Sequence, residues 1–305
     1  MPRLDLIADS ESENERIDKF LAGYIDSFSR SYLQKLIENS DISVNDKNIK
    51  PSYRLKIDDH ITVNVPESII PDIVPEDIPL DILYEDDDVI VVNKPKGMVV
   101  HPSAGNYEHT LVNALMYHCA DNLSGINGVL RPGIVHRIDK DTTGSVIACK
   151  NDLAHAFIAD ALKAHSIKRR YRAIVHGVIE EDEGTVRTFI GRDPQDRTRM
   201  AVVQSGGKEA ITHYKVLDRS DKYSYVECEL ETGRTHQIRV HMAYLHHPIL
   251  GDDKYSNIKC PFKLEGQCLH AMILGFKQPR TGEYIETVAP LPEYFTHLLE
   301  ITHMS

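Results

Sequence analysis

One short stretch of the sequence places a carboxylate among groups that could orient it. Residues 133–144 begin with apolar positions that predict a strand, and they end in Thr-Thr-Gly, which predicts a turn. Backbone N–H and hydroxyl groups in such a turn can orient an ionised acid. The same composition also occurs in ordinary turns, because Asp and Thr satisfy backbone groups in loops. The candidate functional side chains of this stretch are His136, Arg137, Asp139, Thr142 and Gly144.

Two later segments carry further groups of chemical interest. Tyr171 begins a predicted strand directly after the basic run 168–170. A tyrosine at such a position is more often a half-buried structural residue than a catalytic one. Arg234 follows Gly233 where a strand gives way to a helix that Thr235 can cap, and a guanidinium there can pair bidentately with a carboxylate. A carboxylate, an arginine and a tyrosine together suit covalent catalysis by an ionised acid with a weak acid or base nearby.

The familiar metal and cofactor motifs do not occur in the sequence. His236 and His241 are five positions apart without an acidic residue between them, so they do not form H-E-x-x-H. The 5 cysteines are scattered and form no C-x-x-C pair, which indicates reduced thiols and a cytoplasmic protein. Phosphate-binding loops of the G-x-x-x-x-G-K and G-x-G-x-x-G types and the G-x-S-x-G motif are also missing. We therefore expect neither a metal nor a cofactor.

The composition is that of a globular protein with an unevenly distributed charge. The chain has 305 residues and a formal net charge of −11, which by itself argues weakly against a nucleic-acid partner. Residues 67–88, however, contain 9 acidic side chains and no Lys or Arg, whereas basic residues gather at 168–170 and 192–199. A locally positive face is therefore compatible with the negative total. No apolar run is long enough to span a membrane, and residues 1–15 do not have the pattern of a secretory signal.

Periodicity divides the chain into a small unit over residues 14–75 and a larger one over 80–305. The small unit shows two short amphipathic helices, with a turn at 26–27 and a cap at Ser29 or Ser31, followed by strands at 42–44 and 61–65. Prolines recur between residues 66 and 79, which predicts a stiff, extended linker. The small unit also carries basic side chains that could face a partner: Arg16, Arg30, Lys35, Lys47 and Lys50.

The larger unit opens with a buried strand at 89–92, and the turn at 94–97 predicts a hairpin with 98–100. Short apolar strands then alternate with a few helices to the end of the chain. This pattern predicts an α+β fold with a largely antiparallel sheet.

Taken together, these segments resemble the RluA family of pseudouridine synthases, and within it the RluD-like enzymes that act on large-subunit ribosomal RNA. The His-Arg-Ile-Asp run at 136–139 with Thr-Thr-Gly at 142–144 matches the most specific motif of the family, and Asn-Lys-Pro-Lys-Gly at 93–97 matches its opening hairpin. Residues 16–21 and 29–31 are similar to an S4 RNA-binding domain, and residues 191–202 are similar to the RluD-like subgroup. The resemblance covers nearly the whole chain.

The resemblance implies a role for each candidate residue. Asp139 would be the catalytic aspartate that attacks the target uridine, Arg234 would pair with it, and Tyr171 would stack on the base and remove the C5 proton. Arg137 would enter the RNA stack that the uridine leaves. His136, Thr142 and Gly144 would help to bind the substrate. The implied partner is RNA, the implied oligomeric state is a monomer, and no cofactor is needed because the product is an isomer.

Two other classes of function remain open from the sequence. An RNA-binding assembly factor could keep the fold without catalysis, although all three catalytic positions are occupied. A glycosidase would need two carboxylates, which Asp139 and Asp141 could supply, but the S4-like unit would then have no purpose.

Overall fold

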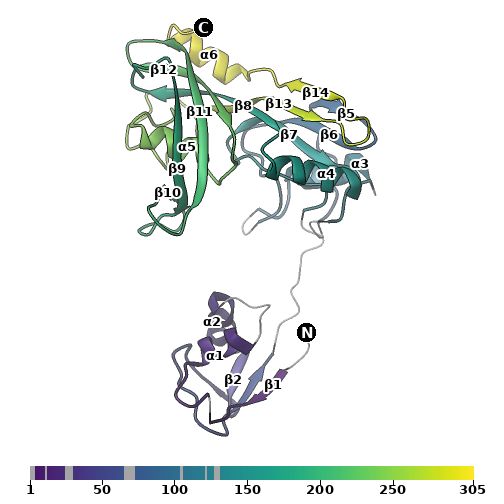
Figure 1. Ribbon diagram of the computed structural model, residues 1–305, viewed down its shortest axis with the longest axis vertical. Coiled ribbons are helices and arrows are strands. Elements are labelled where there is room, and N and C mark those ends of the chain that lie inside the picture. Colours follow the sequence, from purple (N-terminus) through teal and green to yellow (C-terminus); the bar gives the residue numbers. More distant parts are fainter. Residues whose placement is uncertain are drawn as a thin grey trace. The chain divides into compact units, whose positions relative to one another are not determined.

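The computed structural model describes residues 4–10, 12–24, 30–64, 73–103, 106–120, 122–126 and 131–305 (Figure 1). Its internal contacts divide the chain into two compact units, residues 1–70 and 71–305. The turn expected at 26–27 and the cap at Ser29 lie outside the described residues, as does the first half of the expected linker.

The small unit packs two helices on a four-stranded sheet. Its helices are α1 (Ile17–Tyr24) and α2 (Arg30–Glu38), and its strands β1 (Leu4–Ile7), β2 (Ile42–Val44), β3 (Lys47–Asn48) and β4 (His60–Val63) lie in the order β1-β4-β2-β3. Ile17, Leu21 and Leu33 are fully buried, as their helical spacing predicts. Strand β1 was not expected from the sequence; it pairs antiparallel with β4 and shows that this unit starts before residue 14.

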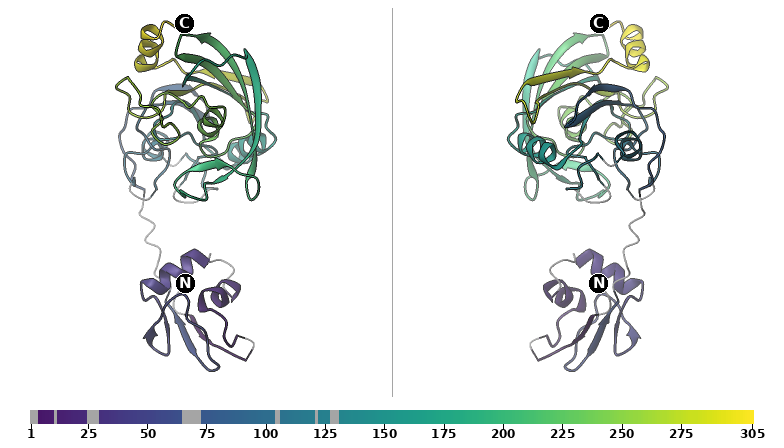
Figure 2. Two further views of the ribbon diagram at one scale, coloured as in Figure 1. Left: turned by 90° about the vertical axis from the view of Figure 1, so that its left-hand side faces the viewer. Right: turned by 90° about the vertical axis from the view of Figure 1, so that its right-hand side faces the viewer.

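The larger unit is built on one mixed sheet. Ten strands among the described residues run β10-β9-β11-β12-β8-β13-β7-β6-β5, with β14 paired to β13. All pairings are antiparallel except that of β13 with β7. Figure 2 shows that the sheet is strongly curved. The strands are β5 (Ile82–Glu85), β6 (Val89–Lys94), β7 (Thr143–Cys149), β8 (Lys168–His176), β9 (Glu183–Arg192), β10 (Met200–Val202), β11 (Lys208–Arg219), β12 (Tyr223–Leu230), β13 (Leu269–Lys277) and β14 (Tyr284–Val288).

Helices cover both faces of the central strands. They are α3 (Leu111–Cys119), α4 (Asp152–Lys163), α5 (Gln237–Tyr244) and α6 (Glu293–Ile301). Val89 and Val91 of β6 join the core on the α4 side, while Ile90 and Val92 join the core that contains α3 and α6. This explains the unbroken apolar run at the start of the unit, because a strand buried on both faces shows no alternation.

The hairpin expected at 94–100 does not form. Strand β6 pairs instead with β5, which precedes it, and residues 98–100 are not in a strand. The reason lies in Lys94, whose buried amine donates to the carbonyl oxygens of Pro95, Met98 and Lys140 at 2.8, 2.8 and 2.9 Å. These bonds fold the chain around the lysine and tie it to the turn that follows Asp139.

The second half of the expected linker packs against the larger unit. Ile73 is buried in its core, the side-chain amide of Asn113 donates to the carbonyl of Val74 at 2.8 Å, and the Glu76 N–H donates to Asn113. The acidic residues at the end of this region are also part of the larger unit and do not form a solvated linker. Asp88 is buried and bound by Arg280 at 2.8 Å.

Strand β8 separates the basic run 168–170 onto two faces. Lys168 and Arg170 point to one face and form ion pairs with Glu286 at 2.8 Å and Glu229 at 2.6 Å. Arg169 is buried on the other face, beside Tyr171. The expected locally positive face is therefore largely neutralised at this strand.

No helix among the described residues is both long and apolar enough to cross a membrane.

Candidate active site

Asp139 is delivered by an extended segment that the neighbouring strand holds in place. Residues 136–139 are not a strand, contrary to expectation, and the backbone pairs with β7 through an isolated bridge from Ile134 to Ala148. The ring nitrogen Nε2 of His136 accepts the N–H of Ile147 at 3.0 Å. The Thr142 N–H then donates to the Asp139 carbonyl at 3.1 Å and closes the turn. The backbone on both sides of Asp139 is thus fixed.

His136 has a structural task in this arrangement. Burial, with a smaller contribution from the Arg169 guanidinium, lowers the pKa of His136 to about 3, so the ring is neutral at physiological pH. The ring must be neutral to accept the Ile147 N–H, because a protonated imidazole has no free acceptor nitrogen. We find His136 at the pocket wall, with the nitrogen Nε2 already engaged by the backbone.

The carboxylate of Asp139 is paired with Arg239. The distance from Arg239 Nη1 to Asp139 Oδ2 is 3.0 Å, and Asp252 holds the same guanidinium from behind, with Oδ2 2.7 Å from Nε and Oδ1 2.8 Å from Nη2. Arg239 and Asp252 are 6% and 2% exposed. Burial alone would lower the pKa of Arg239, but Asp252 and Asp139 together raise it, so the guanidinium stays charged. A fixed, buried cation of this kind holds its partner carboxylate in a defined orientation.

The pairing expected between Arg234 and Asp139 is therefore wrong. Arg234 is half-buried at the pocket wall, and its Nε donates to the backbone carbonyl of Glu209 at 2.8 Å. Helix α5 explains the difference. It begins after Arg234, so this arginine stays on the turn while Arg239 lies within the helix, on a buried face with Ile238 and Met242.

The turn before α5 also departs from expectation. Its cap position is His236, with φ 57°, and not Thr235. Gln237 provides the support that a capping side chain would give: its Oε1 accepts the Arg234 N–H at 2.9 Å and the Thr232 hydroxyl at 2.8 Å. Its Nε2 donates to the carbonyl of Ile211 at 3.0 Å. The turn is thereby anchored to β11.

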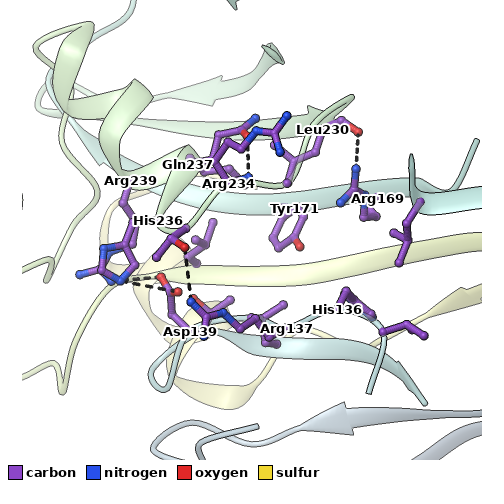
Figure 3. A pocket seen from close by; sticks show the side chains of 18 of the residues that line it. His136, Arg137, Asp139, Arg169, Tyr171, Leu230, Arg234, His236, Gln237 and Arg239 are labelled. Carbon is purple, nitrogen blue, oxygen red and sulfur yellow. Dashed lines mark hydrogen bonds and ion pairs between the residues drawn. The ribbon is translucent and has the colours of Figure 1, made fainter. Parts of the chain in front are cut away.

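A cavity of about 570 Å³ opens beside these groups (Figure 3). Asp139 is the one carboxylate among its described lining residues, and its side chain is 24% exposed. Figure 3 shows Tyr171 between the side chains of Arg169 and Arg234 on one side and the segment with Asp139 on the other. The wall is thus rich in arginine, and the cavity suits an anionic ligand with a planar group.

Tyr171 is buried and comes from the middle of β8, not from its start. Burial raises the pKa of Tyr171; the guanidinium of Arg169 opposes this and the charge of Asp139 adds to it. The hydroxyl is therefore protonated at neutral pH.

Arg137 differs from its neighbours because it is exposed. Among the described residues its guanidinium makes one hydrogen bond, from Nη2 to the hydroxyl of Thr235 at 3.3 Å. A side chain held by one long bond can leave it at little cost.

Asp141 is separated from Asp139 although it is two positions away. It is not among the described residues that line the cavity, and it packs against Gly266. A second carboxylate opposite Asp139, which a glycosidase would need, is missing from the described wall of the cavity.

Thr142 and Gly144, which the resemblance suggested as binding residues, serve the fold. Thr142 touches the cavity, but it is 1% exposed and its hydroxyl accepts the Gln267 amide at 2.9 Å. Gly144 does not line the cavity; it lies where β7 meets β13, with φ +107°. A Cβ there would overlap the carbonyl of Ala271, so glycine is required for the approach of the two strands.

We expect Gly144→Ala to destabilise the larger unit by roughly 3 kcal/mol or more, because backbone strain and overlap add. Gly282→Ala is a matched control, since Gly282 has φ +73° and nothing within 4 Å of the added carbon. The control should cost roughly 1–2 kcal/mol. Urea unfolding followed by circular dichroism measures both. Equal losses in the two variants would show that the approach to Ala271 does not require glycine.

Arg239, the partner of Asp139 that the sequence patterns did not identify, lies in a segment that those patterns had singled out. Arg239 belongs to the same run as Arg234, and its position beside Ile238 on a helix could have indicated an inward arginine. Asp252 lies in a loop whose local pattern gives no signal. His241, the other histidine of the rejected metal motif, is buried and held by the hydroxyls of Thr188 at 2.9 Å and Thr212 at 2.8 Å.

Comparison with known proteins agrees with this geometry. Residues 88–244 match the model of the RNA pseudouridylate synthase family. The chain is 51% identical over 300 residues to the uncharacterized RNA pseudouridine synthase YlyB of Bacillus subtilis, covering 98% of each chain. It is 44% identical over 315 residues to a ribosomal large subunit pseudouridine synthase D of Zymomonas mobilis, covering 100% of this chain and 99% of that one. The chain therefore belongs to the RNA pseudouridylate synthase family, whose members are isomerases.

A solved structure supports the fold of the larger unit. Human RNA pseudouridylate synthase domain containing 1 is 25% identical, with a TM-score of 0.58 over 74% of this chain and 96% of that chain. Within the family, this chain is an RluD-like synthase of the RluA branch, as its similarity to the synthases D indicates.

Proposed function

We propose that this protein isomerises uridine to pseudouridine in large-subunit ribosomal RNA, with Asp139 as nucleophile and without a cofactor. The observation that carries the proposal is the one carboxylate among the described residues of the cavity wall, held 3.0 Å from a buried guanidinium that Asp252 binds from behind. The name of the Zymomonas mobilis relative, a ribosomal large subunit pseudouridine synthase, supports the choice of RNA.

The reaction needs a nucleophile and one proton relocation. Oδ2 of Asp139 is bound by Arg239, which leaves Oδ1 free to attack the ribose of the flipped uridine. The bond from C1′ to N1 breaks as a bond from Oδ1 to C1′ forms; the uracil turns, and the bond from C1′ to Oδ1 breaks again as a bond from C1′ to C5 forms. The C5 proton is lost and N1 gains one, so the product is an isomer and no energy source is needed. Arg239 offsets the negative charge of the carboxylate before attack and after release.

Tyr171 is proposed to stack on the base and to handle the C5 proton. Its position in the cavity between the arginines and Asp139 supports this role. Because its pKa is raised, the phenol must pass on its own proton as it accepts another.

We expect Tyr171→Phe to lower turnover roughly 100-fold or more and to slow a step after glycosidic bond cleavage, because stacking survives and the hydroxyl does not. Tyr225→Phe, a buried tyrosine of the neighbouring strand outside the cavity wall, should turn over normally. Single-turnover kinetics on a uridine-containing stem-loop measures both. Normal turnover in Tyr171→Phe would show that the Tyr171 hydroxyl does not transfer the C5 proton.

Arg137 is proposed to fill the gap that the flipped uridine leaves in the RNA. Its exposure and its one long hydrogen bond support a side chain that is free to move into the stack. This insertion offsets part of the unstacking cost, which is a few kcal/mol.

The small unit is proposed to be an S4-type RNA-binding domain. Two short helices on a small sheet, with exposed Lys47 and Lys50, support this proposal. We also propose that the protein acts as a monomer, as the resemblance implies, and in the cytoplasm, in line with its scattered cysteines.

Deleting residues 1–70 should leave a folded domain that still isomerises uridine but binds structured RNA more weakly. The deletion stops before Ile73, which is part of the remaining core. Each lost phosphate contact should reduce the slope of log affinity against log salt by roughly 0.7 to 0.9. Binding curves at several salt concentrations measure the slope. If affinity and slope were both unchanged, the small unit would not contact the RNA.

A nucleotide-resolution map of pseudouridine in ribosomal RNA tests the proposed function as a whole. Cells that lack the gene should lose pseudouridine at one or more large-subunit positions, and the wild-type gene should restore them. A map that is identical with and without the gene would favour a binding protein without catalysis.

A further inference from the structure

His236 lies at the second oxygen of Asp139, and no step of the proposed mechanism uses it. The distance from His236 Nε2 to Asp139 Oδ1 is 3.8 Å, while Oδ2 belongs to Arg239. The other ring nitrogen, Nδ1, is 2.7 Å from the hydroxyl oxygen of Tyr255. His236 therefore lies between Oδ1 of the carboxylate and a tyrosine that is outside the cavity wall.

The hydrogen bonds of Tyr255 decide which nitrogen of His236 carries the proton. The backbone N–H of Met200 can only donate, and it donates to the Tyr255 oxygen at 2.9 Å. Burial raises the pKa of Tyr255, so the phenol keeps its proton. His236 Nδ1 is the acceptor that the described residues offer to this proton. Nδ1 is then unprotonated, and the neutral ring carries its proton on Nε2, facing Asp139.

The surroundings keep the ring neutral and the tyrosine fixed. Burial lowers the pKa of His236; Asp139 and Asp252 oppose this, while Arg239 and Lys254 add to it. The Tyr255 ring is 9% exposed, with the guanidinium carbons of Arg239 and Arg199 5.1 and 5.2 Å from its centre. His236 is the cap residue of the helix that carries Arg239, so both groups at Asp139 come from one short segment of the chain.

We propose that His236 is a positioning residue for Asp139, that it acts through an Nε2–H directed at Oδ1, and that the hydroxyl of Tyr255 sets this tautomer. The inference rests on the proposed function of Asp139. Arg239 fixes one oxygen, and His236 limits rotation of the other, which is the oxygen left to attack.

The tautomer can be measured without any activity. In protein labelled with ¹⁵N-histidine, long-range ¹H–¹⁵N spectra distinguish Nε2–H from Nδ1–H rings, and the signals missing from His236→Gln identify His236. We expect Nε2–H in the wild type and loss of this single form in Tyr255→Phe, which keeps the aromatic ring. Tyr84→Phe is the matched control: it removes the hydroxyl of a tyrosine in β5 that donates to Asp86, and it should leave the spectrum of His236 unchanged.

Activity then tests whether the donor matters. Gln can direct an N–H to nearly the place of Nε2, whereas Leu cannot, and neither residue favours the φ of 57° at this position. His236→Leu should lower the single-turnover rate roughly 10- to 100-fold, and His236→Gln should recover most of it. Thermal melting checks that both variants are folded.

Three results would overturn the inference: an Nδ1–H or charged His236 in the wild type at neutral pH, an unchanged tautomer in Tyr255→Phe, or equal rates in His236→Leu and the wild type. If the wild type showed no isomerisation of any RNA, the proposed function would fail, while the tautomer measurement would still report on the link between Tyr255 and His236.

Discussion

Asp139→Asn should abolish pseudouridine formation and leave RNA binding nearly intact. The substitution keeps the shape of the side chain and removes the negative charge that the nucleophile needs, so we expect turnover to fall by at least roughly 10³- to 10⁴-fold. Asp139 is 24% exposed at the cavity wall, so the loss should not come from misfolding. Single-turnover kinetics and filter binding with the same stem-loop RNA measure the two properties.

Asp141→Asn is the control for this experiment. Asp141 is a neighbouring carboxylate outside the described cavity wall, and its substitution should leave turnover close to the wild type. Turnover of Asp139→Asn above a hundredth of the wild type, or a larger loss in Asp141→Asn, would contradict the assignment of the nucleophile.

The second large effect belongs to Arg239. Arg239→Gln leaves the carboxylates of Asp139 and Asp252 without their cation, and Asp252 is almost fully buried. We expect a loss of about 3–5 kcal/mol in unfolding free energy, together with a fall in turnover of roughly 10²- to 10³-fold. Arg239→Lys keeps the charge but cannot bind Asp252 through two nitrogens, so its losses should be intermediate. Urea unfolding and single-turnover rates measure the series.

Arg234→Gln provides the comparison that separates the two arginines. Its guanidinium donates to one backbone carbonyl, so the expected loss of stability is about 1 kcal/mol or less. If Arg239→Gln does not fold, the double variant Arg239→Gln with Asp252→Asn can be used. It also removes the buried, unpaired charge of Asp252 and should recover part of the stability. An equal or larger effect of Arg234→Gln on both stability and turnover would mean that the pairing seen with Arg239 does not govern Asp139.

Local patterns in the sequence predicted the elements that position the site. The apolar run at 89–92, the helix after residue 235 and the strand around Tyr171 all follow from periodicity. The α+β class also agrees with the mixed sheet and with the solved pseudouridylate synthase domain. The resemblance to the RluA family agrees with the family match and with the synthases D.

The missed features depend on contacts between distant parts of the chain. Asp252 meets Arg239 through a loop that local sequence cannot place, and Tyr255 reaches His236 in the same way. Helix α5 begins at Gln237, one residue later than a Thr235 cap predicts, so the local pattern placed Arg234 before the helix and Arg239 within it, but it did not indicate which of the two faces Asp139. The hairpin at 94–100 failed because Lys94 binds three carbonyls, one of them in a segment more than forty positions away.

Tritium release from RNA labelled with [5-³H]uridine tests the central claim most directly. Isomerisation replaces the hydrogen at C5 by a bond to the ribose, so each event releases one tritium from the base. With purified protein, large-subunit ribosomal RNA and an excess of EDTA, we expect release to continue at the rate seen without EDTA and to vanish in Asp139→Asn. Release that stops with EDTA and returns with added metal would contradict a mechanism without a cofactor. Release that persists in Asp139→Asn would contradict Asp139 as the nucleophile.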